Sequence, residues 1–350
     1  MYLKSIASAF PEQFYTQPEC AEMARLSPHA EQILTPNSQQ LLQTILDGDS
    51  GISKRHFAIE DMTGVYDLDA GQLNRAYERH APALAAEALA SAMEKSGTAA
   101  AELDAVFICT CTGYLCPGVS SHVAEKLGLR DDAVLHDIVG LGCGAAIPTM
   151  RSASNFLTAN PDATVGVIAV EICSTAFYMS NDPGVLISLC LFGDGASASI
   201  WSGSQTTESL LHCHGFRSKH IPEEREKIRF VNDGGKLKNK LHRSVPAIAA
   251  ETVAEMHAAA PAPSIASRPT RALTHTGGRD VLTAIREQLP QYDLAETAHV
   301  LDQYGNLSSP SVLIALQHYL EETRPEAQEN LFMASFGAGF SCHTCWAESC

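Results

Sequence analysis

The chain has 350 residues, 45% of them hydrophobic and 18% charged, so it can bury a large core and is not a disordered protein. Its formal net charge of -16 would repel a phosphate backbone, which excludes nucleic acid as a partner class. No apolar run approaches the roughly 18 residues of a membrane-spanning helix, and no secretory pattern opens the chain, so we expect no membrane association and a cytoplasmic location. The 11 cysteines are an odd number, and several lie in apolar runs, which is typical of a reducing compartment.

Strand-like and helix-like patterns alternate along the chain. Such alternation predicts a largely parallel sheet covered by helices. The predicted elements, in chain order, are a strand that ends before Pro11, a helix at 81–95, a strand at 105–109, a helix at 145–157, a strand at 165–171, a helix at 247–259, a strand at 271–274 and a helix at 311–320.

The chain also contains a faint two-fold repeat. A buried strand followed by Thr110-Cys-Thr-Gly113 corresponds to a second strand followed by His275-Thr-Gly-Gly278. The same offset relates Asp137-Ile-Val-Gly140 to Asp302-Gln-Tyr-Gly305. Two markers at one offset indicate that the two halves of the chain share a fold.

A third pair of markers closes each copy at a shorter offset, namely Phe192-Gly-Asp-Gly-Ala-Ser197 and Phe336-Gly-Ala-Gly-Phe-Ser341. The first half therefore contains an insertion, part of which we place at 177–184. We expect two α/β halves, residues 1–204 and 205–350, that face each other in a five-layered αβαβα sandwich. Loops from equivalent strand ends would then meet at one central place.

Cys143 is the candidate nucleophile. It lies between a strand-like run and an Ala-rich helical pattern, with Gly142 and Gly144 on either side to permit a tight turn. A cysteine at the start of a helix faces unpaired N–H groups and the positive end of the helix dipole. Both favour the nucleophilic thiolate, and the same N–H groups can hold an oxyanion. The alternative is a small residue at a crowded junction.

His275 and Asn306 are candidate partners of this thiol. An imidazole at the end of a buried strand can donate to a thioester carbonyl or accept a thiol proton, and an amide donates without titrating. Taken alone, His275 also fits a core or surface histidine, and Asn306 fits an ordinary turn residue. The repeat favours catalysis, because it places the loops that bear Cys143, His275 and Asn306 at related strand ends.

These motifs, in this order, resemble those of the type III polyketide synthase family (chalcone and stilbene synthase-like) of the thiolase superfamily, over nearly the whole chain. The resemblance implies an acyltransferase that condenses an acyl-CoA starter with malonyl-CoA, with loss of carbon dioxide, through an acyl-Cys143 thioester. It implies that His275 and Asn306 hold the malonyl thioester carbonyl, and that the enzyme is a homodimer without a resident cofactor. The motifs are the Cys143 elbow, Phe192-Gly-Asp-Gly-Ala196, His275-Thr-Gly-Gly278, Tyr304-Gly-Asn-Leu-Ser-Ser309 and Phe336-Gly-Ala-Gly339.

The resemblance also implies substrate contacts. The loop from Phe336 and Gly337 to Gly339 would border the pocket, Ser308 would line it, and Phe177 matches a gatekeeping position after a small gap. Lys54-Arg55 resembles an early basic motif that pairs with coenzyme A phosphates, and its alternative is an ordinary exposed basic pair. The mixed-charge stretch 217–243 is either a solvated face or part of the rim where an anionic ligand enters.

Other functions remain open at this level. The chain length brings it near ketoacyl-carrier-protein synthase III, which makes one condensation, whereas the His-x-Gly-Gly motif favours a polyketide synthase. Thr276 stands where plant members of the family have proline. An acyl carrier protein is therefore an alternative donor, although an acidic surface favours coenzyme A over an acidic carrier. A cysteine hydrolase has the same order of Cys, His and Asn, but it explains no repeat. The last alternative is a non-catalytic binding protein that retains the fold.

Two cysteine groups raise the possibility of a metal or redox module. One is Cys342-x-x-Cys345 with His343, and the other is Cys109 with its neighbours Cys111 and Cys116. Neither has a second Cys/His pair at the spacing of a zinc ribbon. We therefore predict no metal site.

Overall fold

The computed structural model of the chain describes residues 1–259, 269, 271–322 and 329–350. The described strands form one nine-stranded sheet, in the order β11-β12-β13-β8-β1-β7-β6-β4-β5, and two small two-stranded sheets. The strands are β1 (Tyr2–Ala9), β2 (Phe14–Thr16), β3 (Lys54–His56), β4 (Ala105–Cys109), β5 (Val134–Ile138), β6 (Thr164–Glu171), β7 (Gly195–Ser202), β8 (Leu211–His220), β9 (Ile228–Asp233), β10 (Lys236–Leu241), β11 (Arg271–Thr274), β12 (Asn330–Gly337) and β13 (Ser341–Ser349).

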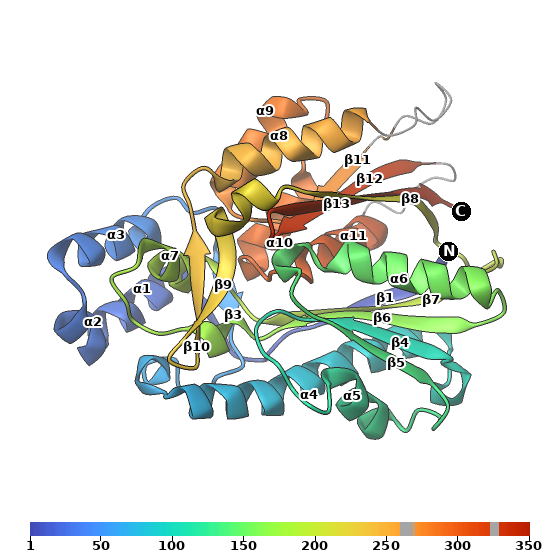
Figure 1. Cartoon of the computed structure of the whole chain (residues 1–350), viewed down its shortest axis with the longest axis horizontal. Helices are drawn as coiled ribbons and strands as arrows, with labels where there is room; N and C mark the ends of the chain where they lie inside the picture. The colour runs from blue at the N-terminus through green and yellow to red at the C-terminus, as the bar shows by residue number, and fades with distance from the viewer. Residues whose placement is uncertain (260–268, 270, 323–328) are drawn as a thin grey trace.

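Helices cover both outer faces of the strands and fill the space between the two halves of the sheet (Figure 1). Apolar residues of α4 pack on one face of β1, β4, β6 and β7, those of α6 and α11 fill the middle layer, and those of α8 and α9 cover β11–β13. This αβαβα arrangement confirms the predicted sandwich. The helices are α1 (Gln17–Leu26), α2 (Pro28–Ile33), α3 (Pro36–Asp47), α4 (Ala70–Ser96), α5 (Val119–Leu127), α6 (Ala146–Ala159), α7 (Pro183–Leu191), α8 (Val245–Ala258), α9 (Arg279–Gln288), α10 (Ala295–Tyr304) and α11 (Ser311–Glu322).

The two halves of the sheet have matching strand orders. They join where β1 and β8 pair through two residue pairs, Tyr2 with His212 and Leu3 with Leu211. From this join, β7, β6 and β4 follow on one side, and β13, β12 and β11 follow on the other. The predicted duplication is therefore confirmed, whereas the boundary between residues 204 and 205 stays a prediction.

The structure contradicts one marker of the predicted repeat, because its two copies lie in different kinds of element. Asp137 lies in strand β5, but Asp302 lies in helix α10, so within the described residues the second half has no strand equivalent to β5. Asn306 accordingly follows a helix rather than a strand. The predicted insertion is confirmed, because the connection from β6 to β7 contains α7, whereas a short turn joins β12 to β13.

Local signals explain where the longest helix begins and ends. Asp69 accepts a hydrogen bond from the Gln72 backbone N at 2.7 Å, and the Gln72 side chain accepts one from the Asp69 backbone N at 2.9 Å, which is a capping box. The helix ends at Gly97, whose φ of +64° suits a left-handed cap. Among the helices described, none combines the length and the apolar character needed to cross a bilayer.

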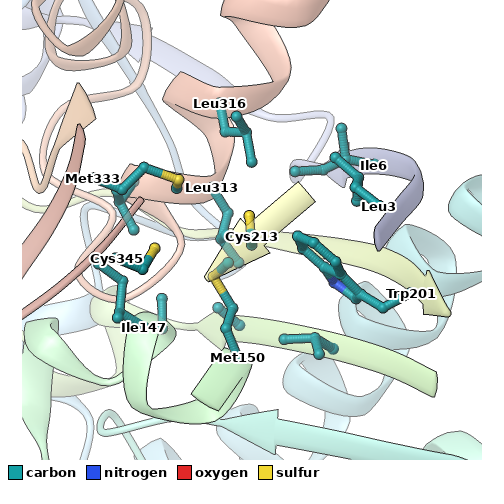
Figure 2. Close-up of a cluster of buried hydrophobic side chains, with 14 of the residues drawn as sticks. Leu3, Ile6, Ile147, Met150, Trp201, Cys213, Leu313, Leu316, Met333 and Cys345 are labelled. Carbon is teal, nitrogen blue, oxygen red and sulfur yellow. The ribbon is translucent and has the colours of Figure 1, made fainter. Parts of the chain in front are cut away.

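The central core fixes the middle layer between the two halves of the sheet. Figure 2 shows side chains from both halves of the chain meeting there, with Ile147 and Met150 from α6, Leu313 and Leu316 from α11, and Trp201 from β7. The Trp201 indole N–H donates to the Ser199 hydroxyl at 2.7 Å, so this large side chain is buried without an unsatisfied donor. Both central helices begin at the candidate site, and their packing therefore holds its loops.

Candidate active site

A cavity of about 720 Å³ is lined by residues of both halves of the chain. Cys143, His275 and Asn306 all line it, together with Phe336 and Ala338. The structure thus brings the three candidate catalytic side chains to one cavity, although Asn306 arrives from a helix. Such a cavity, lined mainly by apolar groups with a few convergent polar ones, is typical of a ligand site.

Cys143 is held in a tight turn before a central helix. The chain leaves β5, turns at Gly140 and Gly142, whose φ values are +89° and +57°, and enters a single 3₁₀ turn at Gly142–Gly144 before α6. A Cβ at Gly142 would lie 3.0 Å from the Ala338 Cβ, so a side chain there is both strained and crowded. The predicted strand–turn–helix context of Cys143 is confirmed.

The pKa of Cys143 shifts in the direction opposite to the one that a place before a helix favours. Burial raises the pKa of Cys143 to about 12, the nearby Glu171 carboxylate raises it further, and a hydrogen bond from Ser308 lowers it only in part. Desolvation of a charged sulfur therefore outweighs the favourable dipole at the helix start. Before substrate binds, Cys143 is a neutral thiol that must lose its proton as it reacts.

Ser308 contacts all three candidate catalytic residues. Its hydroxyl donates to the Cys143 Sγ at 3.2 Å, and its backbone N donates to the Asn306 Oδ1 at 2.8 Å. Its backbone also hydrogen-bonds the His275 imidazole, which raises the pKa of that ring. Ser308 is 1% exposed and has a φ of +58°, which is unusual outside glycine. Ser308 is not among the residues that line this cavity, so its predicted role there stays a prediction.

His275 continues a strand into the cavity. Its backbone N donates to the Ala334 O at 2.9 Å, which extends the parallel pairing of β11 with β12. The Phe336 ring meets the imidazole edge-on, with the ring centroids 5.1 Å apart. Burial lowers the pKa of His275 to about 3, and the Ser308 backbone offsets this only in part. At neutral pH the ring is therefore uncharged and offers both a donor and an acceptor.

This buried neutral imidazole makes stability depend on pH. The pKa of His275 falls from 6.5 to about 3 on folding, so between these values the unfolded chain binds a proton that the native chain does not. The free energy of unfolding should fall as the pH falls through this window, by about 2 kcal/mol from pH 7 to pH 5 for this group. Urea unfolding should show that His275→Gln removes this part of the pH dependence. The exposed His136, changed to Gln, is the control and should keep it. Equal pH dependence in all three proteins would contradict the assignment.

Asn306 is held at both its backbone and its side chain. Its backbone N donates to the Leu191 O at 2.8 Å, and its backbone O accepts from the Gly193 N at 3.1 Å. The Asn306 Nδ2 donates to the Gly277 O at 2.8 Å, on the loop that follows His275. An amide nitrogen has two hydrogens, so one of them is left for a ligand.

The Phe336-Gly337 segment packs directly on the turn that bears Cys143. A Cβ at Gly337 would lie 2.6 Å from the Gly144 backbone N and 2.9 Å from that of Cys143. Only glycine allows this close approach. Phe336 and Ala338 both line the cavity, and both belong to the loop 336–339 that was predicted to border it.

Glu171 is a buried residue that sequence reasoning missed. It is 0% exposed at the end of β6, and burial raises its pKa. Its carboxylate accepts hydrogen bonds from the backbone N atoms of Cys111 and Thr112 at 2.9 and 3.1 Å, and from the Ser309 hydroxyl at 2.6 Å. It therefore joins the loop after β4 to the loop before α11, beneath the thiol. A lone acid that ends an apolar strand was the only signal in the sequence.

The predicted phosphate contact of Arg55 is wrong. Arg55 is 1% exposed, and its guanidinium donates to the Gln17 Oε1 at 3.1 Å and to the backbone O atoms of Leu189 and Phe192, both at 2.8 Å. A buried cation with its donors already paired cannot reach a phosphate in solvent. Lys54 lies over the Phe14 ring, and it is not among the residues that line the cavity.

Phe177 borders a different hollow from the one predicted. It is 2% exposed and packs edge-on against Phe57. It lines a small hollow that also touches Ser308 and shares Phe192 and Phe230 with the wall of the main cavity. Phe177 thus lies one layer behind the main cavity, and a gatekeeping role stays a prediction.

The cysteine pair of the last strand does not form a site. Cys342 belongs to the outer core beneath α8, whereas Cys345 belongs to the central core, because the two side chains leave opposite faces of β13. They cannot share a metal ion or a disulfide. All 11 cysteines of the chain are free thiols.

Among the described residues, three arginines line the cavity and were not predicted individually. Arg229 pairs with Glu226 at 2.6 Å, and Arg279 pairs with Asp49 at 3.1 Å. Arg243 is exposed and forms no ion pair with any residue that the structure describes. Arg229 and Arg243 belong to the mixed-charge stretch 217–243, which favours its interpretation as the rim for an anionic ligand.

Two family models match the chain. The model described as FAE1/Type III polyketide synthase-like protein matches residues 12–221. The model described as 3-oxoacyl-[acyl-carrier-protein] synthase III C terminal matches residues 269–348. The first match covers the nucleophile turn, and the second covers the loops of His275 and Asn306.

Individual proteins show the same similarity. A 1,3,6,8-tetrahydroxynaphthalene synthase of Streptomyces peucetius subsp. caesius is 28% identical over 96% of this chain and 90% of its own length. A 3,5-dihydroxyphenylacetyl-CoA synthase of Streptomyces toyocaensis is 28% identical over 78% of this chain and 73% of its own. The crystal structure of the 1,3,6,8-tetrahydroxynaphthalene synthase of Streptomyces coelicolor A3(2) superposes with a TM-score of 0.87 at 23% identity, over 100% of this chain and 99% of that one. PKS-I of the brown alga Ectocarpus siliculosus gives a TM-score of 0.89 at 21% identity, over 100% and 98%. These superpositions show the fold.

Proposed function

Because the chain belongs to the FAE1/type III polyketide synthase-like family, we propose that Cys143, His275 and Asn306 condense an acyl-CoA starter with malonyl-CoA. The observation that supports these roles is the single cavity lined by all three side chains, with Ser308 in contact with each of them. Members of this family are acyltransferases that form carbon–carbon bonds from thioesters. The reaction needs coenzyme A thioesters as substrates and no resident cofactor.

The first step loads the starter onto Cys143. The sulfur attacks the thioester carbonyl of the acyl-CoA, the carbon–sulfur bond to coenzyme A breaks, and an acyl-Cys143 thioester remains. Burial raises the pKa of the thiol to about 12, so a base must accept its proton during the attack. The neutral imidazole of His275 can accept it and return it to the departing coenzyme A thiolate. We expect the N–H groups of the turn at Gly142–Gly144 to stabilise the developing oxyanion, because they surround the sulfur that attacks.

The second step removes carbon dioxide from malonyl-CoA. The bond to the carboxylate breaks, and its electron pair forms an enolate whose charge collects on the thioester oxygen. An N–H of His275 and the free amide hydrogen of Asn306 stabilise that oxygen. His275 donates this hydrogen bond as a neutral ring. A positively charged ring would stabilise the malonyl carboxylate and so oppose its loss as carbon dioxide. The enolate carbon then attacks acyl-Cys143, and the Cys143 thiolate leaves and takes up a proton.

The cationic rim of the cavity suits a coenzyme A donor. Arg243 has no ion pair among the described residues, so its guanidinium is available for phosphate. We expect Arg243→Glu to raise the KM for malonyl-CoA about tenfold, which corresponds to about 1.4 kcal/mol, with little change in kcat. Steady-state kinetics at low salt measure this change, and added salt should reduce it.

Lys126→Glu is the matched control for this substitution. Lys126 is exposed on α5, outside the cavity, and the exchange alters the net charge by the same amount. An equal rise in KM for both variants would mean that only the overall charge matters. An unchanged KM for Arg243→Glu would contradict the proposed phosphate contact of Arg243.

We also propose that the enzyme is a homodimer of the cytoplasm. Strand β5 ends the large sheet, and its outer edge exposes Leu135 at 37%, beside Val139 at 51%. An apolar sheet edge of this kind pairs readily with another copy. Sedimentation equilibrium should give a dimer, and Leu135→Lys should weaken it. A monomeric parent protein would contradict the proposal.

The free thiols are in keeping with a reducing compartment.

Product analysis tests the proposed reaction. The purified protein is incubated with malonyl-CoA and a panel of acyl-CoA starters, and the products are identified by mass. We expect carbon–carbon products that are longer than the starter, with release of carbon dioxide. A single extension would indicate the ketoacyl-carrier-protein synthase III type of reaction. Release of the free acid alone would indicate a hydrolase and would contradict the proposal.

A further inference from the structure

A second cluster of chemically reactive side chains lies away from the catalytic cavity, on β8 and β13. His212 and His214 leave the same face of β8, because strand residues two apart share a face. Glu348 on β13 lies directly opposite His212 in the antiparallel register. One ligand atom from each of the three, an imidazole nitrogen or a carboxylate oxygen, lies within 4.8 Å of the other two.

The cluster is built on a rigid part of the fold. β8 is paired on one side with β13 and on the other with β1, close to the chain end marked C in Figure 1. Tyr2 pairs with His212 and stacks on its ring, with the centroids 4.6 Å apart and the planes 16° apart. The rings of His212 and His214 are 5.1 Å apart. Backbone pairing and stacking thus hold the groups together before any ligand binds, which lowers the entropy cost of binding.

Within the part of the chain that the structure describes, the polar side-chain atoms of this cluster have no partner outside the cluster. The side chains of His212, His214 and Glu348 make no hydrogen bond or ion pair to another described residue. His214 is exposed, and the other two are half-buried, so an ion can reach them from solvent. None of the three lines the catalytic cavity.

The geometry points to a binding site for a divalent transition-metal ion formed by His212, His214 and Glu348, with zinc as the best match. Two imidazoles and one carboxylate are a common zinc ligand set, and they suit Mg²⁺ or Ca²⁺ poorly because those ions prefer oxygen. Small rotations of the side chains bring their ligand atoms to bond lengths of about 2.0–2.2 Å around one ion. A water molecule then fills the fourth position.

A metal ion at this place would join two strands of the second half. Glu348 lies on the last strand of the chain, and both histidines lie on the strand beside it. The three ligands come together only when β8 and β13 are paired as in the native state, so the ion does not bind the separated strands. Binding therefore stabilises the native state according to the ratio of free metal to Kd. This role is independent of the proposed condensation.

Cobalt spectroscopy on the full chain tests the site. The protein is freed of metal with a chelator and titrated with Co²⁺, then with Zn²⁺ as competitor. We expect about one Co²⁺ per chain, with visible d–d bands and no sulfur-to-metal charge-transfer band, because no cysteine is a ligand. Zn²⁺ should displace the Co²⁺ and raise the Tm.

His214→Ala and Glu348→Gln should each weaken Co²⁺ binding about tenfold or more. His220→Ala, which removes an exposed histidine from the other end of β8, should leave binding unchanged. Thermal unfolding in chelator shows whether each variant still folds. A sulfur-to-metal band, the absence of saturable binding, or equal affinity in His214→Ala and the parent protein would overturn the proposal.

Discussion

Changing Cys143 to alanine will abolish transfer of an acyl group from coenzyme A to the protein, by at least about a thousandfold. The cavity holds this thiol in a turn fixed by glycines, with the Ser308 hydroxyl 3.2 Å away. Removal of the sulfur removes the only protein atom that forms a covalent bond with the starter in the proposed mechanism. Intact-protein mass spectrometry after incubation with acyl-CoA measures the loaded fraction directly.

Cys111→Ala is the informative control for this variant. The Cys111 Sγ lies 3.3 Å from the same Ser308 hydroxyl, so it is the thiol best placed to react in place of Cys143. Burial raises the pKa of both thiols, but Cys143 lines the cavity and Cys111 does not, so we expect acyl-CoA to reach Cys143 alone. Loading should survive in Cys111→Ala and be lost in Cys143→Ala. The reverse pattern would place the nucleophile at Cys111.

Changing His275 or Asn306 to alanine will separate loading from condensation. Both variants keep Cys143 and should still accept the starter, with His275→Ala loading more slowly because its proton acceptor is gone. Each should lose decarboxylation of malonyl-CoA by about a hundredfold to a thousandfold, which is the usual effect of removing one oxyanion donor. Release of labelled carbon dioxide from malonyl-CoA measures this step on the loaded enzyme.

Conservative variants distinguish a lost donor from a damaged fold. His275→Gln keeps an N–H at a similar place and should retain part of the decarboxylation that His275→Ala loses. Asn306→Asp keeps the shape but places a carboxylate where the enolate oxygen forms, so it should be at least as damaging as Asn306→Ala. Decarboxylation at the parent rate in His275→Ala would remove His275 from the proposed mechanism.

Local patterns in the sequence were sufficient for most of the fold. The helix predicted at 81–95 lies within α4, and the strand predicted at 165–171 corresponds to β6. These segments have strong periodicity and pack on faces that the pattern itself marks as apolar. The repeat also predicted how the strands are arranged. β4 and β11 hold corresponding places in the two halves, and each lies beside a strand that leads to the third marker of its half. Asn306 was placed near the site correctly although its preceding element was predicted wrongly.

The remaining features depend on long-range packing. Arg55 is an exposed basic residue by composition, but the fold buries it against Gln17 and two backbone carbonyls. The thiol of Cys143 follows a favourable local rule at a helix start, yet burial by distant segments reverses its expected pKa shift. Glu171 at the end of β6 and Arg243 in a loop have neighbours in space that are far away in the sequence. No local pattern contains that information.

A crystal structure with a malonyl thioester analogue that cannot lose carbon dioxide tests the central claim most directly. The account predicts that the thioester oxygen lies within hydrogen-bonding distance of both the His275 imidazole and the Asn306 Nδ2. It also predicts that the carbon destined to become the nucleophile faces the Cys143 Sγ. A thioester oxygen bound elsewhere in the cavity, with these two donors unoccupied, would contradict the account.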